Sequence, residues 1–309
     1  MKHNSHIYVA SKAVELVASA VDNMADENGQ PFAGQAKTNE RLAAKQRERL
    51  LQYYKHLITE ATWAPDDVLK DNHPFHVFKL FADDEFPGHG LTDLDSFADA
   101  ASGRTYWKFS GGLPYRVDHM AQEIITMEKL RAYNDQYSLK QILYRYMLIS
   151  HYVADAHVPN HCDLRDDPPG AGSPQQPVGK YMLDSAHASL EDLWDKAVTP
   201  VALAEGIVLP GWDARGASPT ALSPKITFDS TDVAQGAAIK VRTIPKNKLM
   251  QFMIGVCVTA KNRARDLYPV DNPQARNDDI LPNLTRSVFA DTVGDLLSVW
   301  RYIWESSRA

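Results

Sequence analysis

Hydrophobic residues recur three and four positions apart along most of the chain, a spacing that places them on one face of an α-helix. Few segments alternate between apolar and polar residues, as half-buried β-strands do. The pattern therefore predicts a mainly helical protein. The predicted helices cover residues of about 6–24, 38–62, 115–134, 138–157, 181–197, 246–267 and 285–306.

Three stretches lack this helical pattern and are predicted as surface segments: about 82–114, 166–180 and 198–230. The first is rich in loop-forming residues, and the other two carry many Pro and Gly residues. Neither of these two resembles a linker between domains, and residues of chemical interest lie on both sides of 166–180. The sequence therefore predicts an all-α fold, a single compact multi-helix domain that spans 1–309.

The composition is that of an ordinary globular protein, with 44% hydrophobic and 23% charged residues. The net charge of −6 argues against a nonspecific surface for duplex nucleic acid, which is normally basic, but allows a local cationic or metal-lined cleft. No apolar run approaches the roughly 20 residues needed to span a bilayer. No lipid-binding helix is recognisable either, so we expect no stable membrane anchor.

The N-terminal segment has an early lysine and an apolar stretch, two features of a signal peptide. However, Lys12 and Glu15 interrupt the part that should be uncharged, and the apolar residues recur at helical spacing. We therefore expect this segment to form the first helix of the mature fold.

The chain has two cysteines, Cys162 and Cys257, which provide neither a disulfide framework nor a thiolate zinc site. A single disulfide can form in an oxidising compartment. The sequence leaves this pairing and two free thiols as open alternatives.

Polar residues interrupt the apolar pattern in the stretch HYVADAHVPNHC (151–162), at the end of a predicted helix. His151 and Asp155 are four residues apart and therefore project from one helix face. Pro159 ends the helix, and His161 follows at the bend. Burying imidazoles and carboxylates is costly unless they are paired or bound to something. A metal site and a set of satisfied core histidines are the two interpretations.

A second pair, His187 and Glu191, repeats the four-residue spacing on the next predicted helix. Taken alone, this pair also fits an exposed contact on a helix surface. Imidazole nitrogen combined with carboxylate oxygen suits zinc, and a catalytic zinc keeps one position for water. The two polar pairs together favour a site for metal ions.

These motifs resemble those of the zinc-dependent phospholipases C and of their relatives, the fungal and plant single-strand nucleases. The signature is His-aromatic-x-x-Asp, a Pro, a second His ten residues after the first, and a downstream His-x3-Glu or His-x3-Asp. The matching residues are His151, Tyr152, Asp155, Pro159, His161, His187 and Glu191. Upstream, NSHIYVASKAVEL (4–16) is similar to the first phospholipase helix, and ATWAPDDVLK followed by HPFHVFK is similar to a nuclease pattern.

The resemblance implies the phospholipase C and nuclease type of fold, with three zinc ions per chain. The ligands that it implies for one zinc are His76, His151, Asp155 and either Asp66 or Asp67. The ligands implied for a second zinc are His161, His187 and Glu191. The ligands implied for the third zinc are His6, Asp155 and the amine and carbonyl groups of Met1.

Two departures from the family pattern bear on these assignments. Family members begin the mature chain with a Trp that chelates the third zinc, whereas this chain carries Met1, whose backbone can replace it only with a free amine. Pro65 also blurs the alignment of Asp66 and Asp67. We favour Asp67, because Lys70 then falls where the nucleases carry a phosphate-orienting cation. The resemblance makes this aspartate a zinc ligand or a general base.

The remaining histidines match no ligand position of the family. They are His3, His56, His73, His89, His119 and His157. His157 follows Asp155 by two residues and should point away from it on the helix.

The function that the resemblance predicts is hydrolysis of phosphate diesters by a zinc-activated water. Glu191 and the first helix follow the phospholipase version, which favours phospholipase C-type cleavage of phospholipid headgroups. The alternatives are a nuclease or nucleotidase acting on single-stranded nucleic acid and a non-enzymatic zinc-binding helical protein. Phe75 and Tyr181 are candidates for the edge of the substrate cleft. The resemblance further implies a secreted or periplasmic protein.

Overall fold

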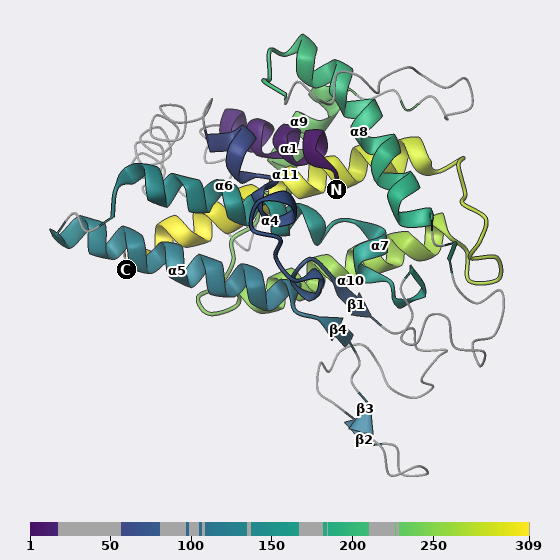
Figure 1. Ribbon diagram of the computed structural model, residues 1–309, viewed down its shortest axis with the longest axis horizontal. Coiled ribbons are helices and arrows are strands. Elements are labelled where there is room, and N and C mark those ends of the chain that lie inside the picture. Colours follow the sequence, from purple (N-terminus) through teal and green to yellow (C-terminus); the bar gives the residue numbers. More distant parts are fainter. Residues whose placement is uncertain are drawn as a thin grey trace.

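Helices make up most of the described chain, which confirms the predicted all-α class (Figure 1). The computed structural model describes residues 1–17, 57–80, 97–98, 105–106, 109–134, 137–166, 182–183, 185–209, 226 and 229–308. Its α-helices are α1 (His3–Leu16), α4 (Ala64–Asp67), α5 (Leu113–Asn134), α6 (Leu139–Asp155), α7 (Pro159–Cys162), α8 (Ala186–Ala204), α9 (Ser230–Lys240), α10 (Leu249–Leu267) and α11 (Leu281–Ser306).

The helix α11 provides the surface on which several other helices pack. It contacts α1, α5, α6, α9 and α10, and it passes behind α1 and α6 in Figure 1. Trp194 of α8 lies edge-on to Phe289 of α11, with 5.9 Å between ring centroids, and Tyr146 of α6 lies 6.2 Å from Trp300. All four rings are fully buried. Because burial of large apolar side chains drives helix packing, these contacts hold α6 and α8 on one core.

Two pairs of short antiparallel strands accompany the helices. The strand β1 (Phe78–Leu80) pairs with β4 (Phe109–Gly111), and β2 (Phe97–Ala98) pairs with β3 (Thr105–Tyr106). Gly111 has a φ of +105°, and a Cβ atom there would lie 2.2 Å from the carbonyl oxygen of Val77. Only glycine fits at this close approach. Val77, the residue that Gly111 approaches, directly follows His76 in the chain.

The end of α6 and the start of α7 position the stretch 151–162. Ser138 and Gln141 form a capping box at the start of α6, and the helix ends at Asp155. Pro159 then occupies the first turn of α7, where its missing N–H costs no hydrogen bond. The prediction that the chain leaves the helix before His161 is correct, but His161 lies in this short helix and not in an open bend.

Most predicted helices correspond to helices of the structure, with shifts at their ends. The ranges 115–134, 138–157, 246–267 and 285–306 correspond to α5, α6, α10 and α11. The helix predicted at the N-terminus is α1, and residues 57–61 are the helical end of the range 38–62. The other residues of 38–62 and those of 6–24 beyond 17 lie outside the described residues.

Two of the predicted surface segments are wrong in part. The range 198–230 begins inside α8, which continues through Pro200 to Ala204, and 82–114 ends in β4 and the start of α5. The helix α9 was not predicted, because it packs on α11 through small residues and lacks a clear apolar period. A Cβ atom at Gly236, for example, would lie 2.9 Å from the Cβ atom of Ala290. Within the described ranges, no helix is long and apolar enough to cross a membrane.

Candidate metal centre

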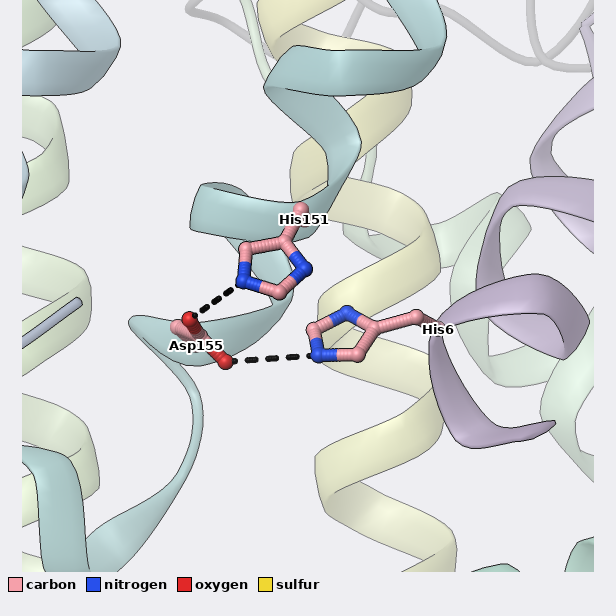
Figure 2. A group of neighbouring side chains, drawn as sticks. All are labelled: His6, His151 and Asp155. Atoms are coloured by element: carbon pink, nitrogen blue, oxygen red, sulfur yellow. Dashed lines mark ion pairs between the residues drawn. The ribbon is translucent and has the colours of Figure 1, made fainter. Parts of the chain in front are cut away.

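The first group of possible metal ligands joins α1 to the end of α6. His6 stacks on His151 with ring centroids 4.1 Å apart and an angle of 14° between the planes. Figure 2 shows Asp155 beside the two stacked imidazoles, with Oδ2 3.1 Å from His151 Nε2 and Oδ1 3.5 Å from His6 Nε2. All three side chains are buried. Their ligand atoms lie within 4.8 Å of one another, close enough to hold one metal ion.

The second group adds two residues that precede β1. His76 Nδ1 lies 3.0 Å from Asp155 Oδ2 and 3.5 Å from Asp66 Oδ1. The same Asp66 oxygen lies 3.5 Å from His151 Nε2. His151 Nδ1 lies 2.8 Å from the carbonyl oxygen of Thr62, to which it donates as the protonated nitrogen. His151 Nε2 is therefore left facing the cluster, as a metal-binding imidazole requires.

The third group lies between α7 and α8. His161 Nε2 and His187 Nε2 are 2.8 Å apart, and Glu191 Oε1 lies 3.5 Å from the former and 3.3 Å from the latter. On its other side, His187 Nδ1 lies 3.5 Å from Asp166 Oδ2. A carboxylate behind a metal-binding imidazole fixes the orientation of the ring.

The α-amino group of Met1 lies between the first and third groups. Its nitrogen is 3.1 Å from Asp155 Oδ1 and 2.7 Å from Glu191 Oε1. Burial alone would lower the pKa of this amine, but Glu191 and Asp155 raise it to about 11. The three groups thus form one continuous set of side chains, and each contributes at least one residue to the lining of a cavity of about 260 Å³. The residues that line this cavity are Met1, Asp66, Asp71, His73, His76, Val77, Asp155, His161, His187 and Glu191.

Without a bound metal ion, burial and neighbouring charges set different protonation states among these groups. Burial lowers the pKa of His161 to about 4 and, together with the nearby His151, holds the pKa of His6 well below its usual value. Burial also opposes ionisation of Asp155, but the Met1 amine and His151 hold its pKa well below the usual range. For His151, burial would lower the pKa, whereas Asp155 and Asp66 raise it to about 10.

The donor atoms fit a metal such as zinc. Within the described residues, both ring nitrogens of His6, His76 Nε2 and His161 Nδ1 are buried without a hydrogen-bond partner. Buried polar atoms normally have a partner, so these nitrogens favour bound ions over a set of satisfied core histidines. The donors are imidazole nitrogens and carboxylate oxygens, a set that zinc accepts, and the described groups contain no cysteine.

The structure distinguishes between the two neighbouring aspartates. Asp66 faces His76 and His151, whereas Asp67 Oδ2 lies 2.7 Å from His3 Nε2. The preference for Asp67 derived from the family pattern therefore does not match the geometry, which places Asp66 in the cluster. The reason is local: α4 is a short helix, in which consecutive side chains project about 100° apart.

Two of the predicted substrate-binding residues, Lys70 and Phe75, are not among the residues that line the cavity. Lys70 is exposed, with φ of +47°, and Phe75 is half-buried with its ring 5.1 Å from the guanidinium of Arg116. Tyr181 lies outside the described residues. The prediction for His157 is correct, because its Nε2 lies 3.3 Å from Asp295 Oδ2 and not beside Asp155.

Sequence analysis missed a polar contact at the edge of the cavity. Arg116 Nη2 donates to Asp71 Oδ2 at 2.6 Å, and the hydroxyl of Tyr152 donates to the same carboxylate. The Arg116 guanidinium also lies over the Tyr152 ring, 5.2 Å from its centroid. Asp71 lines the cavity. No local sequence signal joins these residues, because each comes from a different element.

Comparison of the chain with protein-family models, with curated proteins and with solved structures found no match.

Proposed function

We propose that the protein is a zinc-dependent hydrolase of phosphate diesters that cleaves phospholipids in the manner of a phospholipase C. The observation that carries this proposal is the sharing of one 260 Å³ cavity by three groups of imidazoles and carboxylates. Zinc ions bound by these groups would supply positive charge that neutralises a phosphodiester and lowers the pKa of a bound water. The resemblance of the motifs to the zinc-dependent phospholipases C and single-strand nucleases supports the same function.

The chain contributes ligands and orientation to this chemistry. One zinc would be held by Asp66, His76, His151 and Asp155, and a second by His161, His187 and Glu191. The third would be held by His6, Asp155 and the Met1 backbone. Asp66 is half exposed and lines the cavity, which suits it to accept a proton from an attacking water or to bind the ion directly.

A nuclease acting on single-stranded nucleic acid is the second candidate. Asp66 follows Trp63, Ala64 and Pro65, the stretch that resembles the nuclease pattern, and the structure places Asp66 among the histidines. Against this, Glu191 corresponds to the phospholipase version of the downstream motif. We therefore place phospholipid first and single-stranded nucleic acid second.

Metal analysis and two substrates test the proposal. We expect elemental analysis to find about three zinc ions per chain, one for each group. We also expect release of phosphocholine from phosphatidylcholine micelles, loss of this activity on chelation, and recovery on addition of zinc. Cleavage of a single-stranded oligonucleotide, without cleavage of phosphatidylcholine, would make the nuclease the first candidate and the phospholipase the second. About one metal ion per chain, with neither substrate cleaved, would favour a non-enzymatic zinc-binding protein.

A matched pair of variants tests the role of the aspartate. We expect Asp66→Asn to lower kcat by roughly 10²-fold or more, the scale of a lost base or ligand. Asp67→Asn should stay within about threefold of the unaltered protein, because Asp67 contacts His3 outside the cluster. The reverse order of these two effects would show that Asp67 is the functional residue.

A further inference from the structure

The two cysteines of the chain lie together in the core, far from each other in sequence. Cys162 is the last residue of α7, and Cys257 lies within α10. These two helices pack against each other, and both thiols are fully buried. Burial, and after it the neighbouring Cys162 thiol, raises the pKa of the Cys257 thiol well above its usual value. The packing of α7 on α10 therefore brings the two side chains close together in the core.

The thiols have no role in the candidate metal centre. The groups of possible ligands among the described residues contain only His, Asp and Glu. Cys162 Sγ lies 3.5 Å from the carbonyl oxygen of Ala156, to which it donates. A pair of adjacent thiols that binds no metal can form a disulfide when an oxidant is present.

We propose that Cys162 and Cys257 form a disulfide when the chain folds in the presence of a low-molecular-weight disulfide such as oxidised glutathione. One cysteine thiolate attacks the oxidant, forming a mixed disulfide and releasing one glutathione thiol. The second cysteine then attacks the mixed disulfide and releases the other glutathione. Two protein thiols thus lose two electrons to one molecule of oxidant, which becomes two thiols.

The timing of this reaction follows from the burial of both side chains. The thiolate is the attacking form of cysteine, and burial raises the pKa of the Cys257 thiol well above its usual value. In the folded protein the thiols are therefore slow to react with an oxidant in solution. During folding, before α7 closes on α10, both are accessible. We expect the bond to form at that stage.

The bond would fasten α7 to α10 beside the cavity. His161 directly precedes Cys162, so the short helix that carries this imidazole would be held to α10 by a covalent link. Such a cross-link closes a long loop and restricts the unfolded chain. The oxidised protein should therefore resist unfolding better than the reduced protein.

Cell-free synthesis of the full chain, with and without oxidised glutathione, tests the inference without a refolding step. Soluble protein from the oxidising reaction should have a mass about 2 Da lower than the reduced protein, and it should have no thiol reactive to Ellman's reagent in denaturant. Peptide mapping should join the Cys162 and Cys257 peptides. We expect the oxidised form to melt about 5 °C higher than the reduced form.

The Cys257→Ser variant and a treatment of the folded protein with oxidised glutathione serve as controls. The Cys257→Ser variant should keep one reactive thiol and show no 2 Da loss. Folded, reduced protein treated with oxidised glutathione should react far more slowly than the nascent chain. Two free thiols in soluble protein from the oxidising reaction would overturn the inference. A stable glutathione adduct without the internal bond would overturn it equally.

Discussion

The buried pair of Lys79 and Asp166 offers a direct test of how the structure around the cavity is held together. Lys79 lies on β1, and its Nζ donates to Asp166 Oδ2 at 2.9 Å and to the carbonyl oxygen of Asn160 at 2.6 Å. The exposed fractions of the two charged side chains are only 4% and 5%. Asp166 also accepts from Asn160 Nδ2 at 2.7 Å and lies beside His187.

The substitution Lys79→Met removes the charge and keeps most of the aliphatic stem. It leaves the Asp166 carboxylate buried without its cation, and water cannot compensate because the side chain is almost inaccessible. Loss of one partner of a buried ion pair costs about 3–5 kcal/mol. Because solvent hardly screens a pair that is buried to this extent, we expect the free energy of unfolding to fall by an amount in that range.

The double variant Lys79→Met/Asp166→Asn separates charge from packing. Its amide can still accept from Asn160 but carries no buried charge, so we expect it to recover about half of the loss. The control is Arg145→Met, which breaks the exposed pair with Glu123, 38% and 39% accessible. This change should cost less than about 1 kcal/mol.

Urea denaturation followed by circular dichroism at 222 nm measures all three variants. The slope of the free energy against urea shows whether the comparison is made between similar folded and unfolded states. A loss below about 1 kcal/mol for Lys79→Met would refute the reasoning from burial. A double variant no more stable than the single one would show that the unpaired charge is not the cause.

Two further substitutions test the packing of α11. In Gly294→Ala, the new Cβ atom would lie 2.7 Å from Lys240 Cβ and 2.9 Å from the carbonyl oxygen of Ala237, so α9 must move, at a cost of about 1–3 kcal/mol. An unchanged melting temperature would contradict this close approach. Asp291 is paired with Arg263, and its Oδ1 lies 3.2 Å from Lys240 Nζ. Burial opposes ionisation of this carboxyl group, but Arg263 lowers its pKa below the ordinary 3.8. Because the folded-state pKa is the lower one, this carboxylate stabilises the fold above pH 3.8 and loses its contribution as the pH falls through the folded value. Asp291→Asn should therefore cost about 1.5–3 kcal/mol at pH 7 and progressively less in acid, and a pH-independent difference would contradict the assignment.

The parts of the site that sequence could predict are those set by local spacing. His151 and Asp155 are one helical turn apart, and the helix ends near them because the chain meets Pro159. The polar residues interrupt an apolar helix, so their burial followed from the hydrophobic positions around them. His187 and Glu191 were predictable for the same reason, since α8 repeats the four-residue spacing.

The parts that sequence could not predict depend on contacts between distant elements. The choice between Asp66 and Asp67 required the orientation of α4 relative to His76 and His151. The ion pair of Lys79 with Asp166 required β1 to lie beside the chain that follows α7. Neither contact leaves a periodic trace in the sequence, because each is made by a single side chain on a short element.

Asp155 explains why these separate elements form one site. Its Oδ1 faces His6, His161 and the Met1 amine, while its Oδ2 faces His76 and His151. A carboxylate that uses both oxygens in this way can bridge two cations, so the groups that share it are coupled through one side chain. That position is available because α6 packs against α1 and α11 and its last turn is buried. The apolar face that folds α6 therefore also sets the place at which α1, α7 and α8 bring their ligands together.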